Sequence, residues 1–183
     1  IISFHATKVF NTFEGGAVIS KTKELKLKID NLVNFNLQQG SQNGGLGMNA
    51  KMNEFQACIG LVQLQYYNDC VERRKKIYQT YKAGLVTCPH IDLIDVEMAS
   101  KPNYSYLPIV IKESSAKSRD EIFELFEEKN IILRKYFSTA LNKLDFSSDI
   151  ISNKQQDACP HSDELMKSIL CLPIFPELET KDV

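Results

Sequence analysis

The sequence predicts an α/β protein, and three features of the chain support this fold class. Residues 49–85 carry apolar side chains at helical spacing over an unusually long stretch. Short strand patterns and one helical pattern occupy residues 1–48, and residues 86–183 alternate strand and helix patterns. Strands that alternate with helices are typical of a helical layer packed on a sheet. We therefore expect a first part, a long connecting helix and a small C-terminal α/β domain.

The first part is expected to hold two strands and a helix. Residues 1–4 (IISF) are apolar and strand-like, and 16–20 (GAVIS) form a second candidate strand behind a glycine turn. Apolar residues recur at about helical spacing over 21–39, and Gly40 is a plausible end of this helix. A loop should follow over 40–49, because its glycines make a continuous helix costly.

The strongest helical pattern runs from about Asn49 to Leu85. Its first half has a wide apolar face, which we expect to be buried, formed by Met52, Phe55, Ile59, Val62 and Tyr66. The second half is charged and amphipathic, and Gly84 can end the helix.

The C-terminal part should form a sheet with short helices. The expected strands are 104–111 (YSYLPIVI), 131–137 (IILRKYF) and 170–173 (LCLP), the last of which Pro173 ends. The expected helices are 162–169 (SDELMKSI) and one that begins after Ser118, where Glu121 completes a capping-box pattern.

Composition argues against several classes of function. Lysine and arginine total 22 against 23 acidic residues, with no basic stripe, so nucleic acid is not an expected partner. No apolar run approaches the roughly 20 residues that span a bilayer, so no membrane association is expected. Five cysteines, odd in number and without a C-x-x-C pair, fit a reduced cytoplasmic protein. The cysteines and three histidines show no metal-site spacing, so no metal is expected.

Lys8 is the residue on which the functional interpretation depends. A free lysine amine has a pKa near 10.4 and is a poor nucleophile at neutral pH, so a catalytic lysine must be desolvated or held as an imine. The short polar side chains of Ser3, His5 and Thr7 precede it and could hold an anionic group beside the amine. Most loop lysines are solvated surface charges, and from these residues alone that alternative stays open.

Four ordered blocks carry a resemblance to a known family: SFHATK (3–8), EGGAVIS (14–20), GMNAKMNEFQACIGLVQL (47–64) and CLPIFPEL (171–178). Together they resemble the sugar aminotransferases of the DegT/DnrJ/EryC1/StrS family, which use pyridoxal phosphate and have the aspartate-aminotransferase fold, fold type I. The resemblance spans essentially the whole chain. It implies that residues 1–48 are a remnant of the large cofactor-binding domain, that 49–85 is the connecting helix and that 86–183 is the small domain.

The resemblance also implies roles for individual residues. Lys8 would form the internal Schiff base and carry the proton during catalysis. Ser3 would donate its hydroxyl to the cofactor phosphate. His5 would lie close to cofactor and substrate, with a packing residue behind the loop as the alternative. Asn49 would reach the phosphate of the neighbouring subunit across a homodimer interface, with a helix N-cap as the alternative or an additional role.

Two aromatic residues are candidates for substrate binding. Tyr136 and Phe137 lie in RKYF (134–137), where relatives place a substrate-facing segment. The family form, an aromatic residue followed by proline and histidine, is absent, because Ser138 and Thr139 follow Phe137. A plain strand with a basic edge is the alternative. We assign mainly structural roles to Glu14, Gly15, Gly16, Gly45 and Gly47.

The function that the resemblance implies is transfer of an amino group from an amino acid, glutamate in our expectation, to a nucleotide-linked keto-deoxysugar. The product would serve cell-surface polysaccharide biosynthesis, such as that of lipopolysaccharide O-antigen. The family's chains are about twice this length, and their N-terminal half supplies the carboxylate that faces the cofactor ring nitrogen. Because the chain lacks an initiator Met and a signal peptide, we expect a segment of a longer protein, inactive by itself.

Two alternatives remain at this point. Family members that catalyse dehydration usually replace this lysine with histidine, and the presence of Lys8 argues against that activity. A non-catalytic regulatory or interaction protein on the same fold is the other alternative. The sugar, the stereochemistry and the choice of carbon three or four depend on pocket shape, although RKYF hints at a four-amino product.

Overall fold

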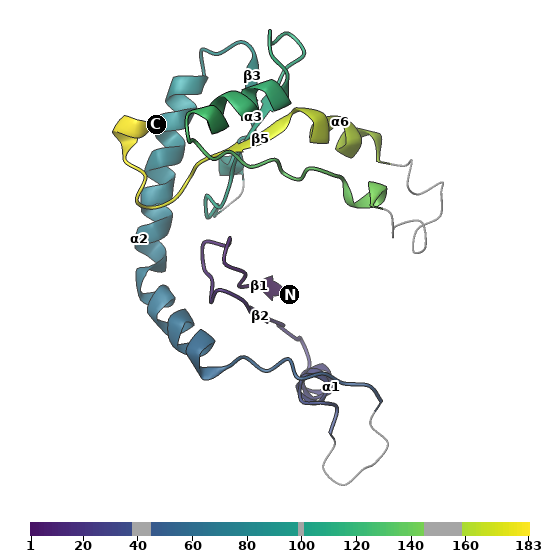
Figure 1. The fold of residues 1–183 in the computed structure, drawn as a ribbon. Helices are drawn as coiled ribbons and strands as arrows, with labels where there is room; N and C mark the ends of the chain where they lie inside the picture. Colours follow the sequence, from purple (N-terminus) through teal and green to yellow (C-terminus); the bar gives the residue numbers. More distant parts are fainter. Residues whose placement is uncertain (38–44, 99–100, 145–158) are drawn as a thin grey trace. The chain divides into compact units, whose positions relative to one another are not determined.

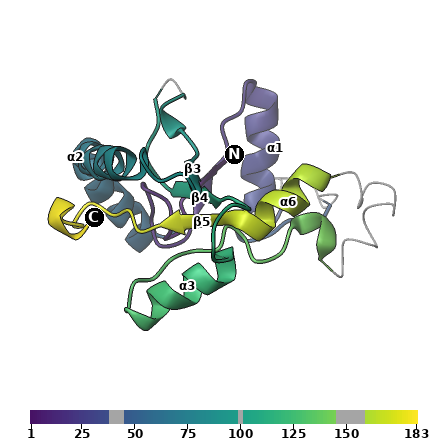
Figure 2. The ribbon, with the colours of Figure 1, turned by 90° about the horizontal axis from the view of Figure 1, so that it is seen from above.

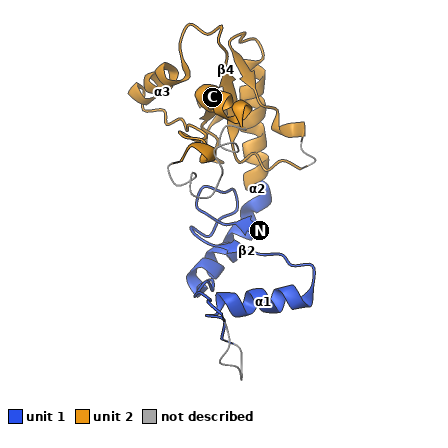
Figure 3. Ribbon diagram, turned by 90° about the vertical axis from the view of Figure 1, so that its right-hand side faces the viewer, with its two compact units in different colours: residues 1–69 blue, residues 70–183 orange. Residues whose placement is uncertain are grey.

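The computed structural model describes residues 1–37, 45–98, 101–144 and 159–183. The chain divides into two compact units, residues 1–69 and 70–183 (Figure 3). The boundary between these two units lies within the long helix, and the domain division expected from the sequence, at residues 48 and 85, stays a prediction. The boundary falls within the helix because the first half of the helix packs against the N-terminal loop, where Gly60 approaches Thr12, and the second half packs on the sheet core.

The first unit contains a two-stranded antiparallel sheet and one short helix (Figure 1). Strand β1 (Ile2–Ser3) pairs with β2 (Gly16–Ala17), so both expected strands exist but are shorter than predicted. Helix α1 (Lys23–Val33) begins at the N-cap Thr22, whose side chain accepts a hydrogen bond from the Leu25 amide.

Helix α1 ends six residues before the predicted end at Gln39. Phe35 and Asn36 follow it with positive φ angles of 61° and 54°, which stop the helical path. Asn34 instead forms an isolated antiparallel bridge with Asn49. Gly40, the predicted stop, lies outside the described residues.

Helix α2 (Glu54–Leu85) begins five residues after the predicted start. Its N-cap is Asn53, whose Oδ1 accepts from the Gln56 amide at 2.8 Å while Gln56 Oε1 accepts from the Asn53 amide at 3.3 Å. The N-cap alternative for Asn49 is therefore wrong. The expected burial of the first half is also wrong in this chain, since Phe55 and Leu61 are each 66% exposed.

The second unit has a three-stranded antiparallel sheet in the order β3-β4-β5 (Figure 2). The strands are β3 (Ile91–Leu93), β4 (Leu107–Ile111) and β5 (Ile169–Leu172), with Ile91 opposite Ile111 and Leu107 opposite Leu172. The segment 131–137 is not the predicted strand. It pairs only through a bridge between Arg134 and Cys171, on the edge of β5 that β4 leaves free.

Helices and short turns complete the second unit. Helix α3 (Arg119–Glu128) has the predicted capping box between Ser118 and Glu121, and α6 (Pro160–Ser168) begins two residues before the predicted 162–169. Short 3-10 turns are η1 (Val96–Met98), η2 (Leu141–Lys143) and η3 (Thr180–Asp182).

The core of the second unit is formed by one face of the sheet and the second half of α2. Its buried members are Tyr78, Tyr104, Leu107, Ile109, Ile111, Leu133, Leu170 and Leu172. Ile122, Phe123 and Phe126 of α3 pack against the same core. Among the described residues, no helix is both long and apolar enough to cross a membrane.

Candidate active site

The loop that carries Lys8 is closed by backbone hydrogen bonds. The Phe4 amide donates to the Gly15 carbonyl at 2.9 Å, and the Thr12 amide donates to the Phe4 carbonyl at 3.0 Å. The Lys8 amide donates to the His5 carbonyl at 2.9 Å, which forms a turn in front of the lysine. These bonds fix the path of the chain through residues 4–15 and hold the lysine backbone in place.

Lys8 combines a fixed backbone with an amine that is not engaged. Its carbonyl accepts from Asn11 Nδ2 at 3.1 Å, and the neighbouring Val9 is buried. The Lys8 side chain is half-buried, and its Nζ makes no hydrogen bond or ion pair with any described residue. An amine outside any ion pair remains available for covalent chemistry.

His5 links the two ends of the loop. Its Nδ1 accepts from the Thr7 amide at 3.2 Å, which assigns the proton of the neutral ring to Nε2. Nε2 lies 3.6 Å from Glu14 Oε1, and the His5 side chain is 50% exposed. His5 is therefore not a packing residue behind the loop. The His5 amide donates to Ser3 Oγ at 3.3 Å, which leaves the Ser3 hydroxyl proton free to donate elsewhere.

Thr12 supports this loop and was not singled out in the sequence. It is buried, and its Oγ1 donates to the Glu14 carbonyl at 2.6 Å. A Cβ on Gly15 would lie 2.8 Å from that Oγ1, and the Gly15 φ of +136° favours glycine. A Cβ on Gly16 would lie 2.8 Å from the Ile2 carbonyl oxygen. The structural roles expected for both glycines fit these contacts, whereas no periodicity marked Thr12.

Asn49 lies on the exposed side of the same unit. It forms an isolated bridge with Asn34. Two residues earlier, at Gly47, the chain passes so close to Asn36 that a Cβ would clash with the Asn36 amide nitrogen. This contact gives Gly47 the structural role expected for it. Gly45 is less constrained by the described part of the chain, in which its Cβ would meet only Asn36 Nδ2, at 3.8 Å.

Tyr136 and Phe137 belong to the second unit. The Tyr136 ring contacts the Tyr106 ring edge-on with centroids 4.9 Å apart, and Phe137 stacks on Tyr136 at 5.0 Å. Burial raises the pKa of the Tyr136 hydroxyl above its usual value. The structure thus places Ser3 at the end of β1, with His5 and Lys8 in the loop that follows, and places the two aromatic candidates together in another unit.

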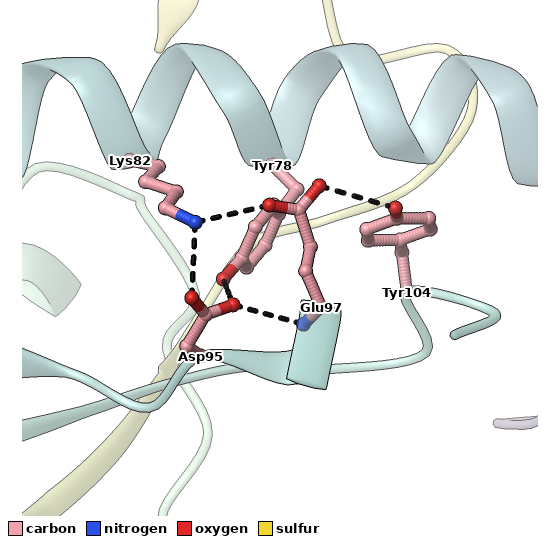
Figure 4. Close-up of polar contacts among 5 residues, drawn as sticks. All are labelled: Tyr78, Lys82, Asp95, Glu97 and Tyr104. Atoms are coloured by element: carbon pink, nitrogen blue, oxygen red, sulfur yellow. Dashed lines mark hydrogen bonds and ion pairs between the residues drawn. The ribbon is translucent and has the colours of Figure 1, made fainter. Parts of the chain in front are cut away.

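A polar network joins α2 to the segment after β3 (Figure 4). Lys82 Nζ lies 3.0 Å from both Asp95 Oδ2 and Glu97 Oε2. Tyr78 donates to Asp95 Oδ1 at 3.0 Å, and the Tyr104 hydroxyl lies 3.4 Å from Glu97 Oε1. The hydrogen bond from Lys82 is the main cause that lowers the pKa of Asp95, and burial raises the pKa of Tyr78.

The described residues contain no group of three or more histidine, cysteine or acidic side chains that could hold a metal ion. All five cysteines are free. Burial raises the pKa of the Cys171 thiol to about 11, so it stays protonated at neutral pH and is not a nucleophile.

A family model decides the identity of the chain, because the model of the DegT/DnrJ/EryC1/StrS aminotransferase family matches residues 1–183. The chain belongs to this aminotransferase family. Among its relatives is the dTDP-4-amino-4,6-dideoxy-D-glucose transaminase of Shigella dysenteriae, 34% identical over 180 residues, which are 98% of this chain and 48% of the relative. The Escherichia coli protein of the same name is 36% identical over 171 residues, 93% of this chain and 46% of the relative. The chain thus spans about half the length of these relatives.

Solved structures confirm the fold class. DesI, crystallised in the presence of its TDP-sugar product, has a TM-score of 0.87 and 30% identity over 98% of this chain and 45% of that chain. Helicobacter pylori PseC, an aminotransferase of pseudoaminic acid biosynthesis, has a TM-score of 0.82 over 98% of this chain and 48% of its own. Its identity of 22% supports the fold alone. The fold is therefore that of part of a sugar aminotransferase of this family.

The cofactor that family membership indicates is pyridoxal phosphate, and the Lys8 loop fits such a group. The aldehyde of the cofactor requires an amine without a competing ion pair, which describes Lys8 in the structure. The phosphate requires a hydrogen-bond donor, and the exposed Ser3 hydroxyl has a free proton. The roles of Ser3, His5, Asn49, Tyr136 and Phe137 toward cofactor and substrate stay predictions.

Proposed function

We propose that the protein carrying these residues is a pyridoxal-phosphate-dependent aminotransferase. It would transfer an amino group from an amino acid, glutamate in our proposal, to carbon four of a nucleotide-linked keto-deoxysugar. The observation that carries this proposal is the unengaged, half-buried Lys8 amine within the loop that the family model covers. The network around Asp95 is not part of this argument, because it holds the second unit together.

Each residue of the loop has a part in this proposal. Lys8 would hold the cofactor covalently through Nζ, and the same Nζ would carry the proton between substrate and cofactor carbons. Ser3 would donate to the phosphate, and His5 would border the substrate with its Nε2 proton oriented by Glu14. Pyridoxal phosphate, when bound, supplies the electron sink and carries the amino group between the two substrates.

The names of the relatives support the choice of acceptor. Two relatives of at least 34% identity are transaminases of dTDP-4-amino-4,6-dideoxy-D-glucose, in which the amine stands on carbon four. A third, 27% identical over 208 residues, is the lipopolysaccharide biosynthesis protein RfbH of Salmonella typhimurium. We accordingly propose a 4-keto-6-deoxy sugar as acceptor and a cell-surface polysaccharide as the destination. The cytoplasmic location stays a prediction.

We further propose a homodimer in which Asn49 of one subunit serves the phosphate site of the other. The exposed position of Asn49 fits this role. The 183 residues alone should show little or no transamination, because they match only about half of each relative. Ordinary turnover by the 183-residue chain would contradict this part of the proposal.

The test is an absorbance spectrum of the complete protein with pyridoxal phosphate, before and after borohydride reduction, followed by peptide mapping. We expect the reduced cofactor on Lys8, and none on Lys21, an exposed lysine of the same unit. Replacement of Lys8 by arginine should lower transamination by at least about 100-fold, because general acid–base catalysis contributes that much or more. Lys21→Arg is the matched control.

The opposite result has a defined meaning. If Lys8 stays unlabelled in folded, cofactor-saturated protein, the transaminase proposal fails and a regulatory or interaction protein on this fold becomes the better interpretation. If Lys8 is labelled but glutamate donates no amino group, only the choice of glutamate as donor is excluded. A panel of other amino acids would then be tested as donors.

A further inference from the structure

A hollow of about 420 Å³ opens in the second unit beside Tyr136. Its lining comes from Asp95 and Val96 after β3, from residues of the segment 102–108 that leads into β4, and from Tyr136. Among the described residues that line it, none is a lysine or arginine, and Asp95 is the one that carries a charge. A hollow without a cation does not suit a phosphate, whereas it suits an uncharged ring.

Aromatic side chains form one wall of this hollow. The ring centroids of Tyr106 and Tyr136 lie 4.9 Å apart with an interplanar angle of 60°. Phe137 is not part of the lining, but its ring stacks on that of Tyr136. Tyr106 and Tyr136 are both only partly buried, so part of each ring faces the hollow. Ligand sites combine such aromatic surface with a few polar groups that fix orientation.

Polar groups with unused hydrogen-bonding capacity lie beside the aromatic wall. Within the described residues, the hydroxyls of Tyr106, Tyr136 and Ser105 make no hydrogen bond. Asn103 Oδ1 accepts from the Ser105 amide at 3.1 Å, which leaves the two donors of the Asn103 amide group unused. Neutral hydroxyl and amide groups of this kind match the hydroxyls of a sugar ring.

The hollow is fixed in shape by the network in Figure 4. Tyr104, one of the lining residues, is 6% exposed. Its carbonyl accepts a hydrogen bond from Arg74 Nη1 at 3.3 Å, and its hydroxyl lies 3.4 Å from Glu97 Oε1. Tyr78 and Lys82 bond to the two carboxylate oxygens of Asp95, so neither oxygen is without a partner. A pocket whose wall is held in this way loses little entropy on binding.

We propose that this hollow binds the hexose ring of the nucleotide-linked sugar, with Tyr106, Asn103 and Ser105 as contact residues beside Tyr136. The inference rests on the proposed function for the nature of the ligand, and adds three residues that determine acceptor binding. The nucleoside and diphosphate would lie outside the hollow, because its described lining offers no cation.

The experiment compares the two halves of the transamination in the complete protein. Tyr106→Phe and Ser105→Ala each remove one hydroxyl, and each should lower kcat/KM for the nucleotide sugar by about 3- to 10-fold, the value of one hydrogen bond. The rate of the glutamate half-reaction, followed by cofactor absorbance, should stay at the wild-type value. Tyr81→Phe is the matched control, since Tyr81 lines a separate, apolar cavity of the same unit.

A second variant separates sugar from nucleoside recognition. Tyr106→Ala should weaken competitive inhibition by the amino-sugar nucleotide and leave inhibition by dTDP unchanged. Equal weakening of both ligands would overturn the proposal, as would unchanged kcat/KM in both Tyr106 variants. A parallel loss of the glutamate half-reaction would also overturn it, because a general structural defect produces that result.

Failure of the proposed function would give a different pattern. The wild-type protein would then lack the glutamate half-reaction altogether. Calorimetric titration of the amino-sugar nucleotide and of dTDP into the wild-type protein and the Tyr106→Phe variant would still test whether the hollow binds the hexose ring. Selective weakening of the sugar nucleotide supports the proposal, and no difference between the proteins overturns it.

Discussion

Gly15 combines a backbone conformation that favours glycine with a close contact that leaves no room for a side chain. Its φ is +136°, and a Cβ there would lie 2.8 Å from Thr12 Oγ1. We expect Gly15→Ala to lower the free energy of unfolding by about 1–3 kcal/mol, because the substitution adds backbone strain to a steric clash.

Gly84 provides the matched control for this substitution. It lies within α2, and nothing is within 4 Å of the position that its Cβ would take. Gly84→Ala should raise the free energy of unfolding by up to about 1 kcal/mol, the helix-interior value, because Gly84 is the second-last residue of α2. Urea denaturation of both variants measures the difference, and equal effects of the same sign would contradict this account.

At the scale of residues, the sequence predicted some parts of the Lys8 loop and missed others. Ser3 was expected in the first strand and Lys8 in the loop that follows it, and the structure has Ser3 at the end of β1 and closes the loop by backbone hydrogen bonds. The sequence could predict this proximity because these residues are close neighbours in the chain. Thr12 could not be found, since its importance arises from contacts with Gly15 and with Gly60 of α2 that no local pattern encodes.

The start of α2 distinguishes two asparagines that the sequence could not separate. Asn53 caps the helix by reciprocal hydrogen bonds with Gln56, whereas Asn49 lies four residues earlier in an exposed bridge. We expect Asn53→Ala to lower the free energy of unfolding by about 0.5–2 kcal/mol, the usual cost of a lost N-cap. Thermal or urea unfolding of the complete protein gives the value.

Asn49→Ala is the informative comparison. Stability should change little, while affinity for pyridoxal phosphate should fall if Asn49 serves the neighbouring subunit. A destabilisation of Asn49→Ala equal to that of Asn53→Ala would contradict the assignment of the cap.

The stability that the contact between α2 and the segment after β3 provides should depend on pH. Lys82, the Glu97 amide and Tyr78 lower the pKa of Asp95, so the folded state favours the ionised carboxylate. Its contribution to stability is complete above the unfolded pKa of about 3.9 and is lost as pH falls through the lower folded pKa. Asp95→Asn should therefore be less stable than wild type at pH 7, with the difference closing at pH values below about 4.

Urea denaturation between neutral and acidic pH measures this difference. A double-mutant cycle with Lys82→Met shows whether the effect belongs to the Lys82 pair, because the coupling energy should vanish in the same acidic range. A difference between wild type and Asp95→Asn that persists unchanged in acid would contradict the assignment.

At the scale of elements, helices were easier to predict than strands. The capping box at Ser118 and the long apolar period of α2 are local signals, and both helices formed. The segment 131–137 has strand-like composition, yet it pairs with the free edge of β5 only at Cys171. How far a pairing extends is decided by the tertiary structure, which the sequence pattern does not contain.

The two units differ in how much apolar surface they bury. The sheet of the second unit has a core with fully buried members such as Tyr78, Leu107 and Leu170. In the first unit, Val9 and Thr12 are buried, whereas many large apolar side chains stay exposed. The sequence correctly predicted a helix with a broad apolar face, but burial of that face requires residues beyond the 183 of this chain or a second copy of it.

This exposed apolar face leads to a prediction for the 183-residue chain by itself. Phe55, Leu61 and Leu64 on α2 are each at least 59% exposed, and exposed apolar surface of this kind drives association in water. We expect the isolated chain to self-associate at micromolar concentration, as measured by sedimentation velocity.

The double variant Leu61→Lys and Leu64→Glu should shift the isolated chain toward monomer, because charged side chains oppose burial of the apolar face of α2. Met98→Lys, which changes an 89% exposed side chain of the second unit, should leave association as it was. A monodisperse monomer of the unmodified chain would show that this face is stable in water and is not an interface.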